Sequence, residues 1–408
     1  MKVMLINCVY KKGSTGKIVY DIYSGLLRDG FDCIVCYGRG TKVNDKNVYK
    51  TCGEFYAKLN NLFSRFTGIM YGGCAFSTST LLNIIDKEKP DIVHIHCING
   101  YFVNIYRLIN FLKKNNVKTL LTLHAEFMHT ANCGYSLECE KWKSGCGQCP
   151  RLKQETKSLF IDNTALSWKK MKKAFDGFNE NLVVASVSPW LKQRAQLSPI
   201  LFDKKHVVVY NGLDTSVFRL SKNNLLRHGL GLENKKIVFH VTSSFSTDIE
   251  HIKGGYYVLE LARRFLKIDE NVRFVVAGPS NSLVDLPSNV IYLGNIADQD
   301  KLAQWYSTSD VTLITSKKET FSMIVAESLC CGTPVVGFEA GAPEMIAMKE
   351  YSSFTPYGSL DELFNTLNRY LYYELFDKEI ISSCAQKQYS RETMIDQYQT
   401  IYGEMLNK

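Results

Sequence analysis

The fold can be inferred from residues 311–336, which read VTLITSKKETFSMIVAESLCCGTPVV. The apolar run 311–314 predicts a buried strand. Residues 326–331 predict a helix, which a glycine and a proline then end. Glu319 falls in the loop between them, and Glu327 about two turns down the helix. A strand joined to a helix in this way is the unit from which parallel sheets are built.

The two glutamates flank a helix start whose free backbone N–H groups face the loop. Carboxylates bind hydroxyl groups, and a helix start binds phosphate. A ligand with hydroxyls at both ends and a phosphate in the middle, such as a sugar nucleotide, would fit this arrangement. The alternative is that Glu319 and Glu327 belong to an ordinary solvated helix face.

Short apolar runs alternate with longer helical patterns along the rest of the chain. Helices are expected, for example, over 254–266, 303–307 and 360–371. Eleven strands are more than one open sheet holds comfortably, so we expect two doubly wound α/β domains that join within 195–225. Ligands of such sheets bind at the carboxyl ends of the strands, here in the cleft between the domains. The expected strands are 3–7, 33–37, 92–96, 119–123, 182–186, 207–210, 237–241, 273–277, 290–293, 311–315 and 334–338.

Composition favours a folded protein of the cytoplasm. The 408 residues suit two domains of ordinary size, with 45% hydrophobic and 22% charged residues. No segment approaches the roughly 20 apolar residues of a membrane helix, and the apolar start is too short for a signal peptide. The net charge of +9 is modest and no recognised nucleic-acid module accompanies it, so we expect no nucleic-acid partner.

Thirteen cysteines are many for a cytoplasmic protein. Nine are scattered and suit core positions, whereas Cys133, Cys139, Cys146 and Cys149 form a cluster. In a reducing compartment such a cluster favours a metal, and four thiolates suit a structural zinc ion. Unliganded thiols or disulfides are the alternative. No acid or histidine stands out as the partner of a catalytic metal.

Residues 151–175 contain seven Lys or Arg side chains against two acids, with apolar side chains interleaved. This pattern suits a basic amphipathic helix at the anionic inner face of the cell membrane. It equally suits an ordinary surface helix with a solvated face.

Several loops that follow expected strands carry candidate ligand contacts. Gly16, just before a helix expected from Ile18, suits phosphate contact. His124 ends the strand 119–123, at the rim where sites form, whereas His94 and His96 share one strand face and are expected to pack internally.

In the second half, Lys253 precedes a glycine and a helix and could neutralise a pyrophosphate leaving group. Gly278 closes the next strand with a tight turn where a base or ribose could lie. The Asp298-Gln299-Asp300 triplet resembles a divalent-ion motif, but we assign it to a helix cap and first turn.

These motifs occur in the order found in the family-4 retaining glycosyltransferases, and the chain resembles that family over nearly its whole length. The stretch from Thr122 to Pro150, with its four cysteines, looks like a bacterial subgroup found in polysaccharide assembly. The motifs are Ser188–Leu191, Asn211–Asp214, Lys253-Gly254, Ala277-Gly278, Glu319-x7-Glu327, Gly332–Val336 and Ala340–Glu344.

The resemblance implies a GT-B fold of two Rossmann-like domains facing a cleft. The implied parts are an acceptor-side domain over 1–200 with a Cys-rich insertion at about 125–155, a nucleotide-sugar domain over 201–384, and a helix over 385–408 that crosses back to the first domain. By analogy, Glu327 binds the donor ribose. The remaining implied donor contacts are Gly16, His124, Lys253, Gly278, Glu319, Phe321, Ser322 and Met323, with His124, Lys253 and Glu319 at the reacting groups.

Ser243 and Ser244 occupy a region where the family usually has an arginine, so one phosphate-binding cation is missing. The implied mechanism retains the anomeric configuration and needs no metal or other cofactor. The chain offers no convincing carboxylate pair for double displacement, so a front-face route fits better.

The expected function is transfer of a sugar from a UDP- or GDP-sugar to a lipid-linked saccharide acceptor at the membrane face during cell-surface polysaccharide synthesis. Two alternatives stay open. A nucleotide-sugar epimerase shares the two-domain fold, and a catalytically weak sugar-nucleotide-binding partner protein would suit the missing arginine.

Overall fold

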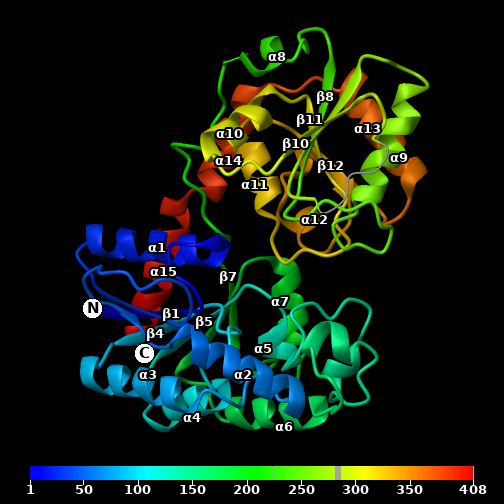
Figure 1. The fold of residues 1–408 in the computed structure, drawn as a ribbon. Coiled ribbons are helices and arrows are strands. Elements are labelled where there is room, and N and C mark those ends of the chain that lie inside the picture. The colour runs from blue at the N-terminus through cyan, green and yellow to red at the C-terminus, as the bar shows by residue number, and fades with distance from the viewer. Residues whose placement is uncertain (224, 281–285, 408) are drawn as a thin grey trace. The chain divides into compact units, whose positions relative to one another are not determined.

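The computed structural model describes residues 1–223, 225–280 and 286–407. The chain forms two compact units (Figure 1). The N-terminal unit contains Met1–Tyr210 and the C-terminal segment from Met394, and the C-terminal unit is Asn211–Thr393. Among the described residues, no helix combines the length and the apolar composition needed to cross a membrane.

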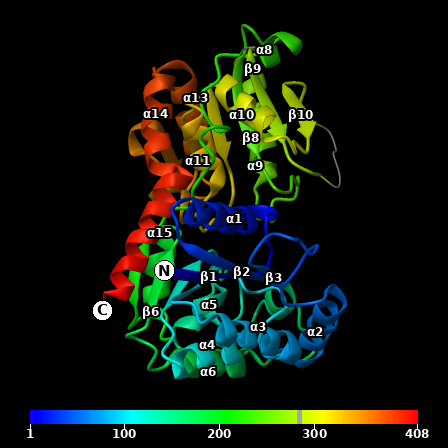
Figure 2. The ribbon, with the colours of Figure 1, turned by 90° about the vertical axis from the view of Figure 1, so that its left-hand side faces the viewer.

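A seven-stranded parallel sheet forms the centre of the N-terminal unit, in the order β3-β2-β1-β4-β5-β6-β7. Figure 2 shows α1 on one side of this sheet and α3, α4 and α6 on the other. The strands are β1 (Lys2–Asn7), β2 (Asp32–Tyr37), β3 (Val48–Lys50), β4 (Ile92–Ile95), β5 (Thr119–Leu123), β6 (Leu182–Ser186) and β7 (Lys205–Val208). The helices are α1 (Gly13–Arg28), α2 (Glu54–Thr67), α3 (Ala75–Glu88), α4 (Ile105–Lys114), α5 (Phe127–Thr130), α6 (Thr164–Phe175) and α7 (Pro189–Gln196).

A six-stranded parallel sheet forms the C-terminal unit, in the order β10-β9-β8-β11-β12-β13. Figure 1 shows α9 and α13 on one side of it and α10, α11 and α14 on the other. The strands are β8 (Lys236–Val241), β9 (Val272–Ala277), β10 (Val290–Gly294), β11 (Val311–Ile314), β12 (Val335–Phe338) and β13 (Ser352–Thr355). The helices are α8 (Leu225–Gly229), α9 (Gly255–Leu266), α10 (Gln299–Thr308), α11 (Met323–Cys330), α12 (Pro343–Ile346), α13 (Leu360–Tyr372) and α14 (Lys378–Tyr389).

The last helix, α15 (Arg391–Leu406), packs into the core of the N-terminal unit together with α1. Ile395 approaches Gly25 of α1 so closely that a Cβ there would lie 2.5 Å from Ile395 Cδ1. Tyr402 Oη lies 2.6 Å from His94 Nδ1, and Tyr398 Oη lies 3.1 Å from Thr122 Oγ1. Apolar packing and buried hydrogen bonds together hold α15 on this unit.

The two doubly wound α/β units are confirmed, and the eleven expected strands all form within a few residues of their predicted bounds. The edge strands β3 and β13 were not expected, because each is only three or four residues long and only partly apolar. Sequence reasoning finds such strands poorly, since they lack a continuous apolar run.

Several helix bounds differ from prediction; for example, α10 begins at Gln299 rather than at residue 303. α1 begins at Gly13 rather than Ile18, and α11 begins at Met323 rather than Ala326. The predicted last helix is two helices, because Ser390 is extended (φ −64°, ψ 150°) and its Oγ caps α15 by accepting from Thr393 N at 3.0 Å. Of 151–175, only α6 is α-helical. Its Trp168, Met171 and Phe175 are buried, so part of its apolar side packs against the protein.

Asp298 and Asp300 are confirmed as a cap and a first-turn acid. The Asp298 carboxylate accepts from the backbone N–H groups of Asp300 and Lys301 at 2.9 and 3.3 Å, at the start of α10. The rejection of a divalent-ion site there therefore agrees with the local hydrogen bonding.

Candidate functional site

In the C-terminal unit, the strand order reverses between β8 and β11, which are neighbours in the sheet. Open parallel sheets bind ligands at such a point, outside the carboxyl ends of the strands. The loop before α9 brings Lys253 there and the loop after β11 brings Glu319. Lys253 Nζ lies 2.6 Å from Glu319 Oε1. The two side chains are 22% and 14% exposed, so the ion pair is reachable but partly shielded from water.

Two glycines allow these loops to approach each other closely. Gly254 has φ 66°, and a Cβ there would lie 2.1 Å from the carbonyl oxygen of Thr315. Thr315 Oγ1 in turn donates to the Lys253 carbonyl at 3.2 Å, which places Lys253 at the end of β11. Gly278 has φ 144°, and a Cβ there would lie 2.2 Å from the Thr242 carbonyl oxygen. Only glycine fits either position without displacing the neighbouring backbone.

Ser322, the N-cap of α11, is strained. It has φ 76° and ψ 88°, a left-handed conformation that costs a residue other than glycine about 1–3 kcal/mol. Its Oγ is buried and has no hydrogen-bond partner among the described residues. Phe321 is buried before it and Met323 begins the helix. Strained residues with unsatisfied polar atoms cluster at ligand sites, and here they lie at a helix start.

α11 begins at Met323, so Glu327 lies about one turn into the helix and not two turns as predicted. Its Oε2 accepts from Tyr306 Oη at 2.9 Å. Burial raises the pKa of Tyr306 well above its usual value, with the Glu327 charge as a second cause, so this hydroxyl stays a neutral donor. The hydrogen bond from Tyr306 therefore holds Oε2 of the Glu327 carboxylate in place.

The loop that carries Glu319 is held by residues 340–344. Glu319 N donates to the Ala340 carbonyl at 2.9 Å, and the Glu344 carboxylate accepts from the N–H groups of Ala340 and Gly341 at 3.0 and 2.8 Å. Glu344 therefore supports the Glu319 loop through the backbone. The sequence signal for this support was the 340–344 motif, to which no role had been assigned.

A second lysine, Lys317, lies on the same loop. Its N–H donates to the Ile252 carbonyl at 2.8 Å, so the Lys317 backbone runs beside the residue that precedes Lys253. Sequence reasoning missed this cation because it is 64 positions from Lys253 in sequence, and only the sheet topology brings the two loops together.

The N-terminal unit has its own point of strand reversal, between β1 and β4. Asn7 connects the two strand ends, since its Oδ1 accepts from Cys97 N at 3.0 Å. Gly16 lies in the first turn of α1, and a Cβ there would lie 3.1 Å from Val9 Cγ2. Its carbonyl accepts from Lys11 N at 3.0 Å. Gly16 thus lets the start of α1 pack tightly against the loop that follows β1.

His124, directly after β5, lies in a cluster of three histidines. Its Nε2 is 3.1 Å from His96 Nδ1, and the two rings stack with centroids 5.4 Å apart. Burial lowers the pKa of His124 to about 4, so the ring is neutral at neutral pH. The prediction that His94 and His96 are internal is confirmed, because both are fully buried and their rings lie 3.9 Å apart.

The four clustered cysteines, Cys133, Cys139, Cys146 and Cys149, line one cavity of about 30 Å³. Burial raises the pKa of Cys133 to about 12 and of Cys146 to about 11, so these thiols are neutral. Among the described residues, no group of three or more His, Cys, Asp or Glu side chains is arranged to hold a metal ion. None of the four is in a disulfide. Zinc binding stays a prediction.

Known proteins resemble this chain in sequence and in fold. Residues 237–372 match the model of the family described as glycosyl transferases group 1. Over 99% of its length the chain is 21% identical to a protein of Escherichia coli strain K12 named as a colanic acid biosynthesis glycosyl transferase, WcaC, all of which is covered. It is 26% identical to the N-acetyl-alpha-D-glucosaminyl L-malate synthase of Bacillus anthracis, with 98% of this chain and 96% of that one covered.

Among solved structures, the chain is similar to HepE of Anabaena in complex with UDP and glucose. The TM-score is 0.63 at 17% identity, and the match covers 99% of this chain and all of HepE. The chain has the two-unit GT-B fold, and residues 237–372 match the glycosyl transferases group 1 family. The matched family segment runs from β8 into α13 and therefore includes Lys253, Glu319 and Glu327.

Proposed function

We propose that this chain transfers a sugar from a UDP- or GDP-sugar to a lipid-linked saccharide acceptor in the synthesis of a cell-surface polysaccharide. The observation that carries the proposal is the Lys253–Glu319 pair, which lies at the strand reversal together with the strained start of α11. The name of the E. coli relative supports polysaccharide assembly, and the UDP bound to HepE supports a nucleotide donor.

In this proposal each donor group meets one protein group. The ribose hydroxyls bind Glu327, whose second oxygen is held by Tyr306. The diphosphate binds the free N–H groups at the start of α11 and the ammonium of Lys253. The sugar hydroxyls bind Glu319. Gly16 and His124 of the N-terminal unit are the proposed contacts to the phosphate and the sugar.

Loss of the leaving group builds negative charge on the diphosphate, and Lys253 with the α11 N–H groups stabilises that charge. We propose that this suffices without a metal. The bond from the sugar C1 to the phosphate oxygen breaks, and a bond from C1 to the acceptor hydroxyl oxygen forms on the same face. The hydroxyl proton passes to the departing phosphate oxygen, so the anomeric configuration is retained.

Lys317 is the proposed substitute for the missing arginine. Ser243 and Ser244 cannot supply a positive charge, and Arg263 is paired on α9 with the Glu260 carboxylate. Lys317 lies on the Glu319 loop, and its backbone N–H donates to the Ile252 carbonyl, which brings this residue beside the Lys253 segment.

A transfer assay tests the reaction type. Purified protein is incubated with a donor and a membrane extract of saccharide acceptors, with and without EDTA, and the anomer of the product is determined by NMR. We expect a product with the donor's configuration at an unchanged rate in EDTA. An inverted product would refute the front-face route. A rate that EDTA abolishes and that Mg²⁺ or Mn²⁺ restores would refute metal independence, because those ions do not replace a structural zinc ion held by thiolates.

The catalytically weak binding protein is the second candidate, because of the missing arginine. It predicts donor binding without transfer to any acceptor. An epimerase would instead exchange deuterium from D₂O into the sugar ring with no acceptor present, which the transferase would not do.

A further inference from the structure

The helix α2 (Glu54–Thr67) has its apolar side turned to solvent. The small residues Ala57 and Ser64 are the ones it buries. Its exposed side contains Phe55, Leu59, Leu62, Phe63 and Phe66, which are 75%, 47%, 48%, 55% and 50% exposed. At 100° per residue, these five fall within an arc of about 100°. A surface helix of a globular protein normally buries such a stripe, whereas α2 exposes it.

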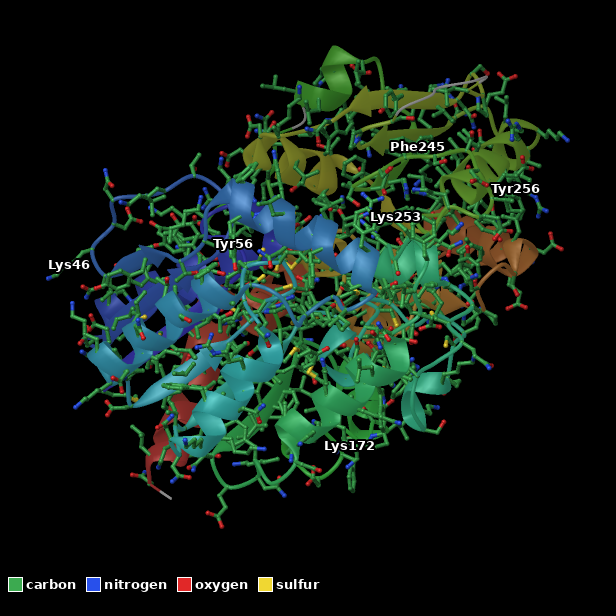
Figure 3. All side chains as sticks on the ribbon, turned by 60° about the horizontal axis from the view of Figure 1, so that its bottom comes forward. Lys46, Tyr56, Lys172, Phe245, Lys253 and Tyr256 are labelled. Atoms are coloured by element: carbon green, nitrogen blue, oxygen red, sulfur yellow. The ribbon has the colours of Figure 1, made fainter. Side chains whose placement is uncertain are left out.

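Two further segments extend the stripe. Phe76, at the start of α3, is 78% exposed, and its ring lies 5.9 Å from that of Tyr56 on α2. Phe160 is 80% exposed and Ile161 48%. Figure 3 labels Tyr56 on α2.

The segment with Phe160 and Ile161 is fastened to the end of α2 by backbone groups. Leu159 N donates to the Arg65 carbonyl at 2.8 Å, and Asn163 Nδ2 donates to the Thr67 carbonyl at 2.7 Å. We call the combined surface the α2 face. It consists of Phe55, Leu59, Leu62, Phe63, Phe66, Phe76, Phe160 and Ile161.

Positive charge borders the α2 face. Lys58 and Arg65 are exposed and, seven positions apart, share one flank of the stripe, and Lys157 is exposed beside the Phe160 segment. The acids nearby are engaged elsewhere. Glu54 pairs with Arg39 and accepts from Gly40 N, and the Asp162 carboxylate accepts from Cys149 N and Thr164.

We propose that the α2 face docks the N-terminal unit on an anionic lipid bilayer. Phenylalanine and leucine on one side with Lys and Arg at the flank is the composition of helices that lie in the plane of a membrane interface. Anionic headgroups would attract the bordering cations. A second copy of the chain is a poorer occupant, because a two-fold contact would press two surfaces of the same positive charge together. The proposal does not depend on the transfer reaction.

Vesicle sedimentation tests the docking. Wild-type protein is mixed with vesicles of phosphatidylcholine alone or with about a third phosphatidylglycerol, at low and high salt. We expect at least tenfold more bound protein on the anionic vesicles, and loss of most of it at high salt. Equal binding to both vesicles, or none to either, would overturn the proposal.

Substitutions on the α2 face test whether this surface binds the vesicles. Phe63→Ser with Phe66→Ser, and separately Lys58→Glu with Arg65→Glu, should each reduce binding at least tenfold. The matched control is Phe202→Ser, which removes an equally exposed aromatic (61%) from the same unit and should bind as wild type. Retention of binding by both double variants would refute the assignment, as would an equal loss in the control.

Size-exclusion chromatography tests the alternative that a second copy of the chain covers the α2 face. If the wild type were a dimer that did not bind vesicles, and the Phe63→Ser, Phe66→Ser variant were a monomer, the α2 face would cover a second copy of the chain. Because neither assay involves a donor, failure of the membrane proposal leaves the proposed function standing, and failure of donor binding leaves the membrane proposal standing.

Discussion

Lys253 and Glu319 are 66 positions apart and form one ion pair because of the two loops that carry them. The sequence predicted both side chains at loop positions after strands, and the resemblance supplied their roles. It could not predict that Glu344 and Tyr306 hold Glu319 and Glu327 in place, because those contacts depend on which elements the topology makes neighbours. Lys317 was missed for the same reason.

Lys253→Met should reduce kcat about 100-fold or more in a transfer assay, with a smaller change in KM, because a fixed cation stabilises charge that develops only as the diphosphate departs. Lys267→Met, an exposed lysine of the same unit, is the control and should retain wild-type kinetics. A variant that lost only substrate affinity, with kcat unchanged, would argue against the leaving-group role.

Gly254→Ala should destabilise the protein by about 1–3 kcal/mol in urea unfolding, since alanine would be strained at φ 66° and its Cβ would meet the Thr315 carbonyl. Gly403→Ala is the control. It lies inside α15 with open space around its Cα, and there alanine should stabilise by about 0.5–1 kcal/mol. If Gly254→Ala unfolded like the wild type, the close approach of the two loops would be wrong.

At the scale of elements, periodicity and apolar runs predicted most strands and helices. The failures have physical causes. Short edge strands have no apolar run, and the break at Ser390 depends on a side-chain cap that the helical pattern of 385–406 conceals. Periodicity identifies an apolar stripe but does not say whether it faces a core, which is why the exposed face of α2 is visible only in the structure.

Hydrogen bonds within the Cys-rich insertion tie its loops together. Lys141 Nζ donates to the carbonyls of Gly147 and Gln148 at 3.1 and 2.6 Å, and Cys149 N donates to Asp162 Oδ2 at 2.6 Å. These bonds keep the four thiols around one cavity, which a zinc ion could close by replacing the thiol protons.

Metal analysis of the purified protein tests the zinc prediction. We expect about one zinc per chain, reduced severalfold by Cys146→Ser, because a structural site needs four ligands. Cys384→Ser, outside the insertion, should leave the zinc content unchanged. Zinc below about 0.2 per chain in the wild type would refute the prediction.

At the scale of the whole molecule, both units bury histidines in neutral form. Burial lowers the pKa of His124 in the N-terminal unit and of His240 in the C-terminal unit to about 4, and lowers those of His94 and His96 well below the usual value. The unfolded chain would protonate these rings near pH 6.5, so it binds more protons than the folded chain below that pH.

Stability should therefore be fully present above about pH 6.5 and fall progressively as the pH drops toward about 4. Urea unfolding at a series of pH values across this window measures the effect as a falling midpoint with an unchanged slope. Constant or rising stability on acidification would show that the histidines are not buried as neutral rings.

The central proposal is that a nucleotide sugar binds at the start of α11 with its ribose on Glu327. The most direct test is calorimetry of the wild type and of Glu327→Gln against a panel of UDP- and GDP-sugars. We predict saturable binding of one donor by the wild type and at least a tenfold weaker affinity in Glu327→Gln, with an unchanged melting temperature in the absence of ligand. Equal affinity in both proteins, or no binding of any donor at millimolar concentration, would contradict the central claim.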